Sequence, residues 1–349
     1  MTTVALDGCG AERGPEAIVA GVEAAAANGI RLRVFGDPNP LGAVERISGA
    51  ELIPVTEEIT NAEEPVAAVR SRPEASIVRV ARDVAEGRSQ ALASAGPTGA
   101  TMAAALFALR RMQGVRRPAL ALQLVVPGRQ GPPTLLLDVG ANTEARAVDL
   151  VQFAYLGAAF SAAVLGVARP RVALLSVGEE SSKGRGDVVE AHQRLAAATG
   201  HDAGEPVSGI DFRGNVEGRD LLTGAADVIV ADGFTGNVVL KTIEGTAKAV
   251  ADAVRAAARS GPRAAAGGLL LRPSLGGLRR QMDPDTTGGA ILLGLRGVAV
   301  VGHGSSGREG IANAVRLAAR AVDERAIERM GDLLRRSGMT RGAMLGRRK

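Results

Sequence analysis

Aromatic side chains are scarce in this chain, which has six Phe, one Tyr and no Trp among 349 residues. Proteins that bind single-stranded nucleic acid stack bases on aromatic rings, so the scarcity counts against nucleic acid as a partner. Cysteine is scarcer still, since Cys9 is the only one. A lone cysteine forms no intrachain disulfide, which fits a reducing compartment.

The N-terminus lacks a basic segment followed by an apolar run, so we see no signal peptide and expect a cytoplasmic protein. Two uncharged stretches, 89–109 and 150–168, are long enough to cross a bilayer. The first contains Gly96-Pro97-Thr98-Gly99, a pattern typical of a strand–turn–helix junction, and the second is rich in Ala, Gly and Ser. We therefore expect both to lie in the core of a soluble protein.

Motifs of several enzyme classes are also absent. The sequence has no Walker loop and no Gly-x-Ser-x-Gly elbow, and Arg13 stands where a dinucleotide-binding motif needs its last glycine. One cysteine and three scattered histidines do not make a zinc motif, and we expect no metal or other cofactor. His192 and His201 fall within and after a helical pattern, whereas His303 lies between two glycines at a strand end and is favoured as a site residue.

Glycine, by contrast, is abundant, with 46 residues and no collagen-like or low-complexity period. Short β-branched runs alternate with longer Ala-rich stretches, which predicts βαβ units and an α/β fold with a mostly parallel sheet. Because the strands are apolar throughout, we expect helices on both faces, giving three α/β/α layers. We expect one domain over 1–332, closed by a single helix over 308–330, with a helical excursion near 260–285 and a flexible basic tail over 333–349.

Several predicted strands end in glycine-rich turns. Ligands of such sheets bind beyond the carboxyl ends of the strands. There, glycine lets the backbone approach an oxyanion, and the next helix offers free N–H groups. The sequence therefore predicts a site for a phosphate-like anion. The turns are 7–10, 94–100, 138–142, 177–184, 232–237 and 302–306.

These turns, in this order, resemble those of the PlsX-type phosphate acyltransferases of bacterial phospholipid synthesis. The resemblance extends from residue 4 to about residue 316. The family's first loop is similar to Asp-Ala-Met-Gly-Gly-Asp, so Cys9 stands at a methionine position and is not expected to be a nucleophile. Pro97 stands where the family usually has Asn. The matching segments are Ala5-Leu6-Asp7, Ser94-Ala95-Gly96-x-Thr98-Gly99-Ala100, 134–142, 178–184, 214–220, 232–245 and 302–306.

The resemblance implies transfer of a long acyl chain from acyl-acyl carrier protein to inorganic phosphate, giving acyl phosphate. It also implies a fold similar to the phosphotransacetylase and isocitrate dehydrogenase group, a homodimer, and peripheral contact with the inner face of the cell membrane. Three alternatives stay open from the residues alone. They are a phosphate acyltransferase using short acyl-coenzyme A, an NAD-dependent oxidoreductase of similar fold, and a non-catalytic scaffold at the membrane surface.

The chemistry that the resemblance implies fits the residues. A thioester is already activated and phosphate is itself the nucleophile, so the protein has to supply a phosphate cradle and oxyanion donors rather than a catalytic triad. We expect Lys183 to neutralise phosphate and His303 to donate to the thioester oxygen or orient phosphate, with Asn237 the third catalytic candidate. The cradle is assigned to Ser94, Gly96, Thr98, Gly236 and Asn237, and Asp7, Asp138 and Asp232 are expected to cap or orient loops. The other candidate binding residues are Gly8, Gly99, Asn142, Gly178, Glu179, Asn215, Thr235 and Ser305.

The excursion carries a second hypothesis, because its apolar residues recur at helical spacing with arginines at other positions. Such a basic amphipathic helix can lie on an anionic membrane, but a dimer-interface or core helix has the same pattern. The apolar positions are Leu271, Leu275, Leu278 and Met282, and the basic ones are Arg272, Arg279 and Arg280.

Overall fold

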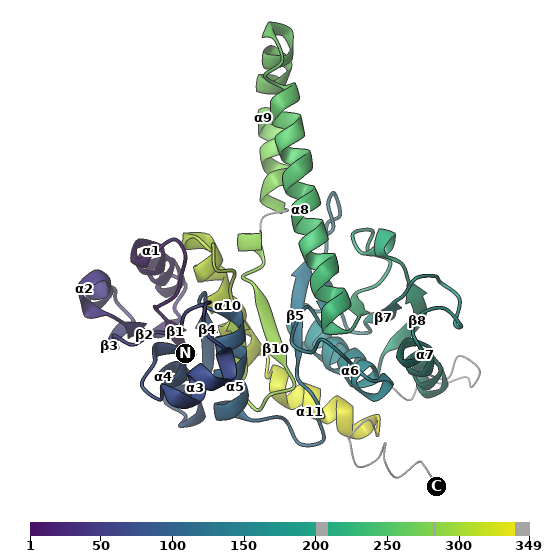
Figure 1. Ribbon diagram of the computed structural model, residues 1–349, viewed down its shortest axis with the longest axis horizontal. Helices are drawn as coiled ribbons and strands as arrows, with labels where there is room; N and C mark the ends of the chain where they lie inside the picture. The colour runs from purple at the N-terminus through teal and green to yellow at the C-terminus, as the bar shows by residue number, and fades with distance from the viewer. Residues whose placement is uncertain (200–208, 282–283, 339–349) are drawn as a thin grey trace.

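Eleven strands form one sheet in the computed structural model, which describes residues 1–199, 209–281 and 284–338 (Figure 1). The strands are β1 Thr3–Asp7, β2 Arg31–Gly36, β3 Ala50–Pro54, β4 Ala91–Ser94, β5 Ala119–Leu124, β6 Thr134–Leu137, β7 Arg171–Leu175, β8 Asp211–Val216, β9 Val228–Val230, β10 Ala290–Leu293 and β11 Val298–Val301. The α-helices are α1 Pro15–Ala26, α2 Pro38–Leu41, α3 Pro65–Ser71, α4 Ser76–Ala85, α5 Thr98–Leu109, α6 Ala147–Val164, α7 Gly186–Thr199, α8 Gly233–Ala257, α9 Pro262–Gln281, α10 Arg308–Asp323 and α11 Ala326–Arg336. Three short 3-10 helices are η1 Gly42–Arg46, η2 Gly218–Asp220 and η3 Pro284–Thr286.

The sheet consists of two parallel groups joined by an antiparallel centre. Its order is β3-β2-β1-β4-β11-β10-β5-β6-β9-β7-β8. Pairing is parallel from β3 to β11 and again from β6 to β8, but β10 is antiparallel to both neighbours and β5 is antiparallel to β6. The prediction of a mostly parallel sheet is confirmed. The two parallel groups nevertheless run in opposite directions, so their carboxyl ends do not share one edge.

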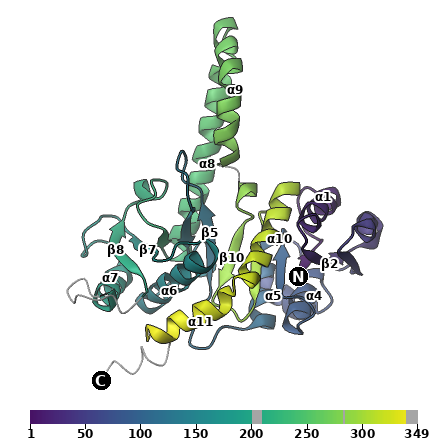
Figure 2. The same cartoon turned by 180° about the vertical axis from the view of Figure 1, so that it is seen from behind.

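Helices cover both faces of the sheet, which confirms the three-layer prediction (Figures 1 and 2). One core includes side chains from α1, α6, α7, α10 and α11, and the other includes side chains from α3, α4, α5 and the base of α8. Alternate residues of β5 serve the two cores: Ala121 packs into the first, whereas Leu120 and Leu124 pack into the second. This alternation follows from the two-residue period of a strand.

Helix α6 is the one helix of the described residues long and apolar enough to cross a membrane by length and composition. Of its residues, 89% are buried inside the protein, and the helix packs against α11, α7 and β9 among other elements. Tyr155, Phe153 and Phe160 on this helix are among the largest fully buried side chains. It therefore has the packing expected of a core helix.

Several elements differ from the sequence prediction. The strands β8 and β10 were not predicted, because β8 contains Arg213 and Gly214 and β10 lies between glycines. The predicted helix over 308–330 is two helices, since Arg325 adopts a left-handed conformation with φ 52°. Helix α11 then continues to Arg336 with Leu334 buried, so the helix takes up residues 333–336 of the expected tail. Residues 339–349 lie outside the described part of the chain.

The expected excursion is a long helical hairpin that projects from the sheet (Figure 1). The base of α8 packs on the core through Val239, Leu240 and Ile243. Beyond that point the helix leaves the core, and α9 runs back beside it. The two helices approach closely at Gly268, where an added Cβ would lie 2.9 Å from the Cβ of Ala258.

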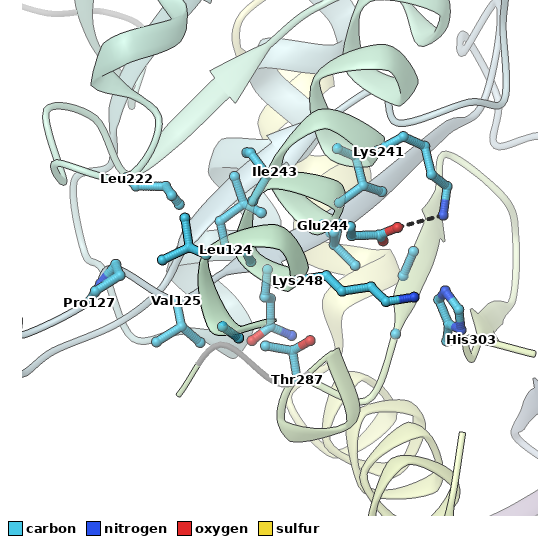
Figure 3. A pocket seen from close by; sticks show the side chains of 18 of the residues that line it. Leu124, Val125, Pro127, Leu222, Lys241, Ile243, Glu244, Lys248, Thr287 and His303 are labelled. Carbon is cyan, nitrogen blue, oxygen red and sulfur yellow. Dashed lines mark hydrogen bonds and ion pairs between the residues drawn. The ribbon is translucent and has the colours of Figure 1, made fainter. Parts of the chain in front are cut away.

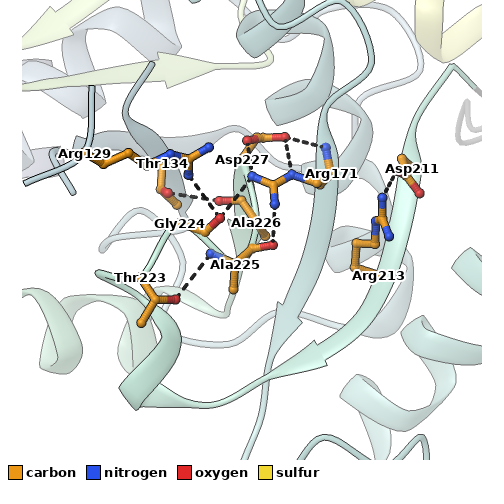
Figure 4. Close-up of polar contacts among 10 residues, drawn as sticks. All are labelled: Arg129, Thr134, Arg171, Asp211, Arg213, Thr223, Gly224, Ala225, Ala226 and Asp227. Carbon is orange, nitrogen blue, oxygen red and sulfur yellow. Dashed lines mark hydrogen bonds and ion pairs between the residues drawn. The ribbon is translucent and has the colours of Figure 1, made fainter. Parts of the chain in front are cut away.

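In the parallel group β6-β9-β7-β8, a bidentate ion pair links the start of β7 to the start of β9 (Figure 4). Arg171 donates to Asp227 through Nε at 3.0 Å and Nη2 at 2.8 Å. The Arg171 amide also donates to Asp227 Oδ2, and the Asp227 amide donates to the Arg171 carbonyl, each at 2.9 Å. Burial opposes ionisation of Asp227, but these bonds from Arg171 hold its pKa below the usual value. Thr134 of β6 donates to the carbonyl of Ala226, so β6 joins the same cluster.

Candidate active site

A cavity of about 1860 Å³ lies between β5, helix α8 and the turns that follow β1, β4 and β11 (Figure 3). The polar residues Gly96, Thr98, Asn237 and His303 from the predicted turns line it. In Figure 3, Lys248 points toward His303, whereas Leu222, Leu124 and Pro127 lie on the other side. The cavity thus joins a polar end, which carries Lys248 and His303, to an apolar wall.

The turn after β4 is built around Ser94, which is buried. Its hydroxyl donates to Asp7 Oδ2 at 2.9 Å and accepts from the amide of Gly96 at 3.0 Å and from the Thr101 hydroxyl at 3.2 Å. Helix α5 then starts at Thr98 without a side-chain cap, so its first N–H groups have no partner within the helix and carry partial positive charge. Asp7 and Ser94 therefore hold the turn in place from its buried side, whereas Gly96 and Thr98 line the cavity.

Burial affects both ionisable groups beneath this turn. It raises the pKa of Asp7 to about 6, although the hydrogen bond from Ser94 opposes the shift. It also raises the pKa of the Cys9 thiol to about 11, with the Asp7 charge adding to the effect. A thiol with that pKa stays protonated near neutral pH, so Cys9 is unsuited to be a nucleophile. Gly8 has a packing role, because an added Cβ would lie 2.9 Å from the carbonyl oxygen of Phe35.

The turn after β11 lies against the turns after β1 and β4. The amide of Gly302 donates to the Ser94 carbonyl at 2.7 Å, and the amide of Glu12 donates to the Gly304 carbonyl at 2.9 Å. Within the turn, the Ser305 hydroxyl lies 2.8 Å from Nδ1 of His303. This contact orients the ring, so that Ser305 positions His303 at the cavity wall.

Asp138 and Asn142, after β6, hold the backbone together rather than line the cavity. Asp138 is fully buried and accepts from the amides of Leu120, Gly140, Ala141 and Asn142, and from the Asn142 side chain. Burial raises its pKa against these donors. The Asn142 side chain also donates to the Pro118 carbonyl at 2.7 Å. These contacts make Asp138 a loop-capping residue, which is the role expected for it.

Helix α8 begins tightly against this loop. Asp232 caps it by accepting from the amide and the hydroxyl of Thr235, at 2.8 and 3.0 Å. An added Cβ at Gly236 would lie 1.9 Å from the carbonyl oxygen of Asp138, so only glycine permits this approach. Similarly, a Cβ at Gly99 would lie 2.6 Å from the Pro65 ring. These two glycines set backbone packing, and the adjacent Asn237 and Thr98 reach the cavity.

The turn after β7 is not part of the cavity wall. Lys183 is exposed, and its carbonyl accepts from the Ser176 hydroxyl. Glu179 pairs with Arg219 at 3.2 Å, and Asn215 contacts the Glu180 carbonyl and the ring of His192. The buried Gly178 belongs to the same turn. The structure therefore does not bring Lys183, Gly178, Glu179 or Asn215 to the cavity that holds His303 and Asn237.

Two lysines of α8 that the sequence analysis did not select do line the cavity. Lys241 pairs with Glu244 at 2.7 Å, whereas Lys248 makes no ion pair within the described residues. Asn237, Lys241, Glu244 and Lys248 recur every three or four residues and so share one face of the helix. That spacing is the signal that could have revealed them. The apolar residues of α8 that line the cavity are Leu240, Ile243, Ala247, Val250, Ala251 and Val254.

Of the residues expected at a membrane, Leu271 is 57% exposed and Arg272 lines the outer part of the cavity. Leu275, Leu278, Arg279 and Arg280 belong to α9, but their side chains lie outside the described residues, as do His201 and Met282 entirely.

Comparison with solved structures shows which fold this is. A branched-chain phosphotransacylase from Enterococcus faecalis V583 superposes with a TM-score of 0.59 at 17% identity, covering 92% of this chain and 99% of that one. A 4-hydroxythreonine-4-phosphate dehydrogenase from Klebsiella pneumoniae gives a TM-score of 0.51 at 15% identity, covering 91% and 98%. At such identities the likeness establishes the fold, which confirms the expected similarity to phosphotransacetylases.

Sequence comparison shows the family. The family described as "Fatty acid synthesis protein" matches residues 2–329. The phosphate acyltransferase of Heliobacterium modesticaldum is 42% identical over 328 residues, covering 92% of this chain and 94% of the relative. That of Geobacillus thermodenitrificans is 43% identical over 325 residues, covering 91% and 94%. The chain therefore belongs to the phosphate acyltransferases, enzymes of fatty acid and phospholipid synthesis.

Proposed function

We propose that the enzyme transfers a long-chain acyl group from acyl-acyl carrier protein to inorganic phosphate, giving acyl phosphate for phospholipid synthesis. The observation that supports this best is the composition of the cavity wall. Leu120, Leu122 and Leu124 of β5 line one continuous space with the apolar residues at the base of α8, which are Leu240 and Ile243. An alkyl chain removed from water there gains about 25 cal/mol per Å² of buried surface. A short acyl group would leave most of that wall unused.

The polar end supplies what the reaction needs. A phosphate oxygen forms a bond to the thioester carbon, the carbon–sulfur bond breaks, and the thiolate leaves with its electron pair. The α5 N-terminus at Thr98 and the ammonium of Lys248 hold the phosphate anion, and Asn237 or His303 donates to the developing oxyanion. In this proposal Lys248 takes the charge-neutralising role that the sequence analysis gave to Lys183.

The test is a product assay. Purified protein is given a palmitoyl-acyl carrier protein thioester with and without phosphate, and acyl phosphate is trapped with hydroxylamine. We expect phosphate-dependent hydroxamate. The short-chain alternative is measured side by side with acetyl-coenzyme A, and preference for that donor would overturn the long-chain assignment.

We further propose a homodimer formed through the exposed part of α8. Val250 and Val254 are 57% and 43% exposed on a helix that leaves the core. Apolar residues in such a row are typical of an interface. Light scattering should give a dimer mass for the protein and a monomer mass for Val250→Glu/Val254→Glu.

Finally, we propose a cytoplasmic enzyme that touches anionic membrane through α9. Leu269, Leu270 and Leu271 are 67%, 81% and 57% exposed beside Arg272. Apolar side chains next to a cation favour an anionic lipid surface. Wild-type protein should float with anionic liposomes, and Leu270→Glu/Leu271→Glu should not. Equal flotation of both proteins would argue for the dimer-interface or core role of this helix instead.

A further inference from the structure

A second hollow of about 310 Å³ adjoins the main cavity and is lined by three arginines. Arg129 comes from the loop after β5, and Arg316 and Arg320 come from α10. Gln123, Val125 and Thr287 line both spaces, so the hollow opens beside the proposed acyl-transfer site. We refer to it as the arginine hollow.

Arg316 is fixed in place but poorly neutralised. Its Nη1 donates to Asn313 Oδ1 at 2.7 Å and its Nη2 to the Ala24 carbonyl at 3.2 Å. The nearest carboxylate is that of the exposed Glu309, 3.9 Å from Nη1. The Nε is buried and has no hydrogen-bond partner. Because Nη1 and Nη2 bond neutral acceptors, the positive charge of Arg316 is only weakly compensated.

The other two arginines also lack a carboxylate of their own. Arg129 Nη1 donates to the Gly224 carbonyl at 3.1 Å, and its charge acts on Asp227, which Arg171 already pairs (Figure 4). The Arg320 side chain makes no hydrogen bond or ion pair with the described residues. It stands four residues from Arg316 on the same helix, an arrangement in which like charges repel.

No carboxylate occurs among the described residues that line the arginine hollow. Three arginine residues line the hollow with one weak ion pair among them, so the hollow carries a positive charge that attracts an anion. Guanidinium forks match the oxygens of a phosphate group and bind it through paired hydrogen bonds. The space is small for a protein helix, which is about 10–12 Å across with its side chains, but a phosphate group fits it.

We propose that the arginine hollow binds a phosphate group, namely the phosphodiester of the phosphopantetheine arm that carries the acyl thioester. This assignment rests on the proposed function, because the arm belongs to the donor of that reaction. Its place beside the cavity lets the anchored phosphate direct the thioester toward the polar end. The arginines of the hollow could equally bind inorganic phosphate before it reaches the acyl-transfer site. The experiment separates these two sources of the phosphate group.

The experiment compares binding of 4′-phosphopantetheine, pantetheine and inorganic phosphate by calorimetry. The variants are Arg320→Gln, which removes an exposed side chain without a partner, and Arg316→Gln/Arg320→Gln. The control Arg329→Gln/Arg335→Gln removes two charges from α11, where each arginine pairs with an exposed carboxylate. We expect wild type and control to bind phosphopantetheine about tenfold or more tightly than pantetheine, since a charge-assisted hydrogen bond contributes about 1.5–3 kcal/mol. Both hollow variants should lose this preference.

Kinetics identify the source of the phosphate. The hollow variants should raise the KM for the acyl donor about tenfold and leave the KM for inorganic phosphate unchanged. A rise confined to the KM for phosphate would overturn the arm assignment in favour of free phosphate. If the hollow variants bound all three probes as the wild type does, the arginine hollow would not be a phosphate site. Because binding is measured without turnover, a protein that discriminates the probes but forms no acyl phosphate would sink the proposed function alone.

Discussion

The turns after β4 and β11 face a cavity, whereas the equally glycine-rich turn after β7 does not. The first two contribute Gly96, Thr98 and His303 to one wall. The third leaves Lys183 exposed and directs Glu179 to Arg219. Strand direction alone does not explain the difference, because β6 and β9 run parallel to β7 and the segments after them reach the cavity through Val139 and Asn237. What sets β7 apart is its place in the sheet, where it lies farther from the central strands β5 and β10 than β6 and β9 do. Glycine at a strand end thus permits a close approach of the backbone, and the strand's place in the sheet order decides which segment lies close to it.

Exchanging lysines for alanines would sharpen this comparison most. Lys248→Ala should lower kcat/KM for phosphate about tenfold to a hundredfold, because it removes a charge-assisted contact of about 1.5–3 kcal/mol. Lys183→Ala, the matched control in the turn after β7, should leave it unchanged. Steady-state kinetics with varied phosphate measure both. The opposite pattern would return the anion site to the turn after β7.

The apolar wall can be tested by filling it. Leu122→Trp should shorten the longest acyl chain accepted, because the indole occupies space between β5 and α8. We expect the ratio of kcat/KM for a sixteen-carbon donor to that for an eight-carbon donor to fall about tenfold, the difference that about 1.4 kcal/mol of lost burial makes. Each donor serves as the other's control for folding. An unchanged ratio would remove the acyl chain from this wall.

The smallest effect expected is a change in the pH dependence of stability, which separates two buried carboxylates. Asp7 has a folded-state pKa raised to about 6 by burial, so the folded protein binds its proton more tightly than the unfolded chain. Its contribution to stability is therefore present below about pH 4 and lost as pH rises toward 6. In urea unfolding, the free energy of unfolding of Asp7→Asn should therefore exceed that of the wild type by more at pH 7 than at pH 4.

Asp83 supplies the control with the opposite sign. Burial opposes its ionisation, but hydrogen bonds from Arg88, Ser89 and Arg33 hold its pKa below the usual value. Its contribution is present at neutral pH and is lost as pH falls through the folded-state pKa. The free energy of unfolding of Asp83→Asn should therefore be lower than that of the wild type at pH 7, and the difference should shrink in acid. The same slope for both variants would contradict the burial argument for Asp7.

Much of the architecture could be predicted from local pattern. The alternation of β-branched runs with Ala-rich stretches gave the three layers, and the long apolar stretch around Tyr155 was expected to be a core helix. The strand β10 was missed because four apolar residues between glycines carry no period that separates a strand from a loop. The break at Arg325 was missed because a left-handed residue other than glycine leaves no compositional mark.

For the site, local pattern located Thr98, Asn237 and His303 but could not tell lining residues from supporting ones. Ser94 was expected in the phosphate cradle and Asp138 as a loop cap, because both stand in the matching turns. Both are buried beneath those turns and hold backbone amides in place. Lys248 was overlooked because Asn237 was assigned to a turn, and the helix face that the two residues share follows only from the helical spacing of residues 237, 241, 244 and 248.

The sequence by itself determined the family, the layered fold and the glycine-rich turns, because each depends on residues that are neighbours along the chain or on an extended match. Only the tertiary structure decided which turns meet, which lysine faces them, and that β5 and α8 enclose an apolar wall. Those properties depend on the order of the strands in the sheet and on the path of α8 across it. Both are set by packing between segments more than a hundred residues apart, which no local pattern encodes.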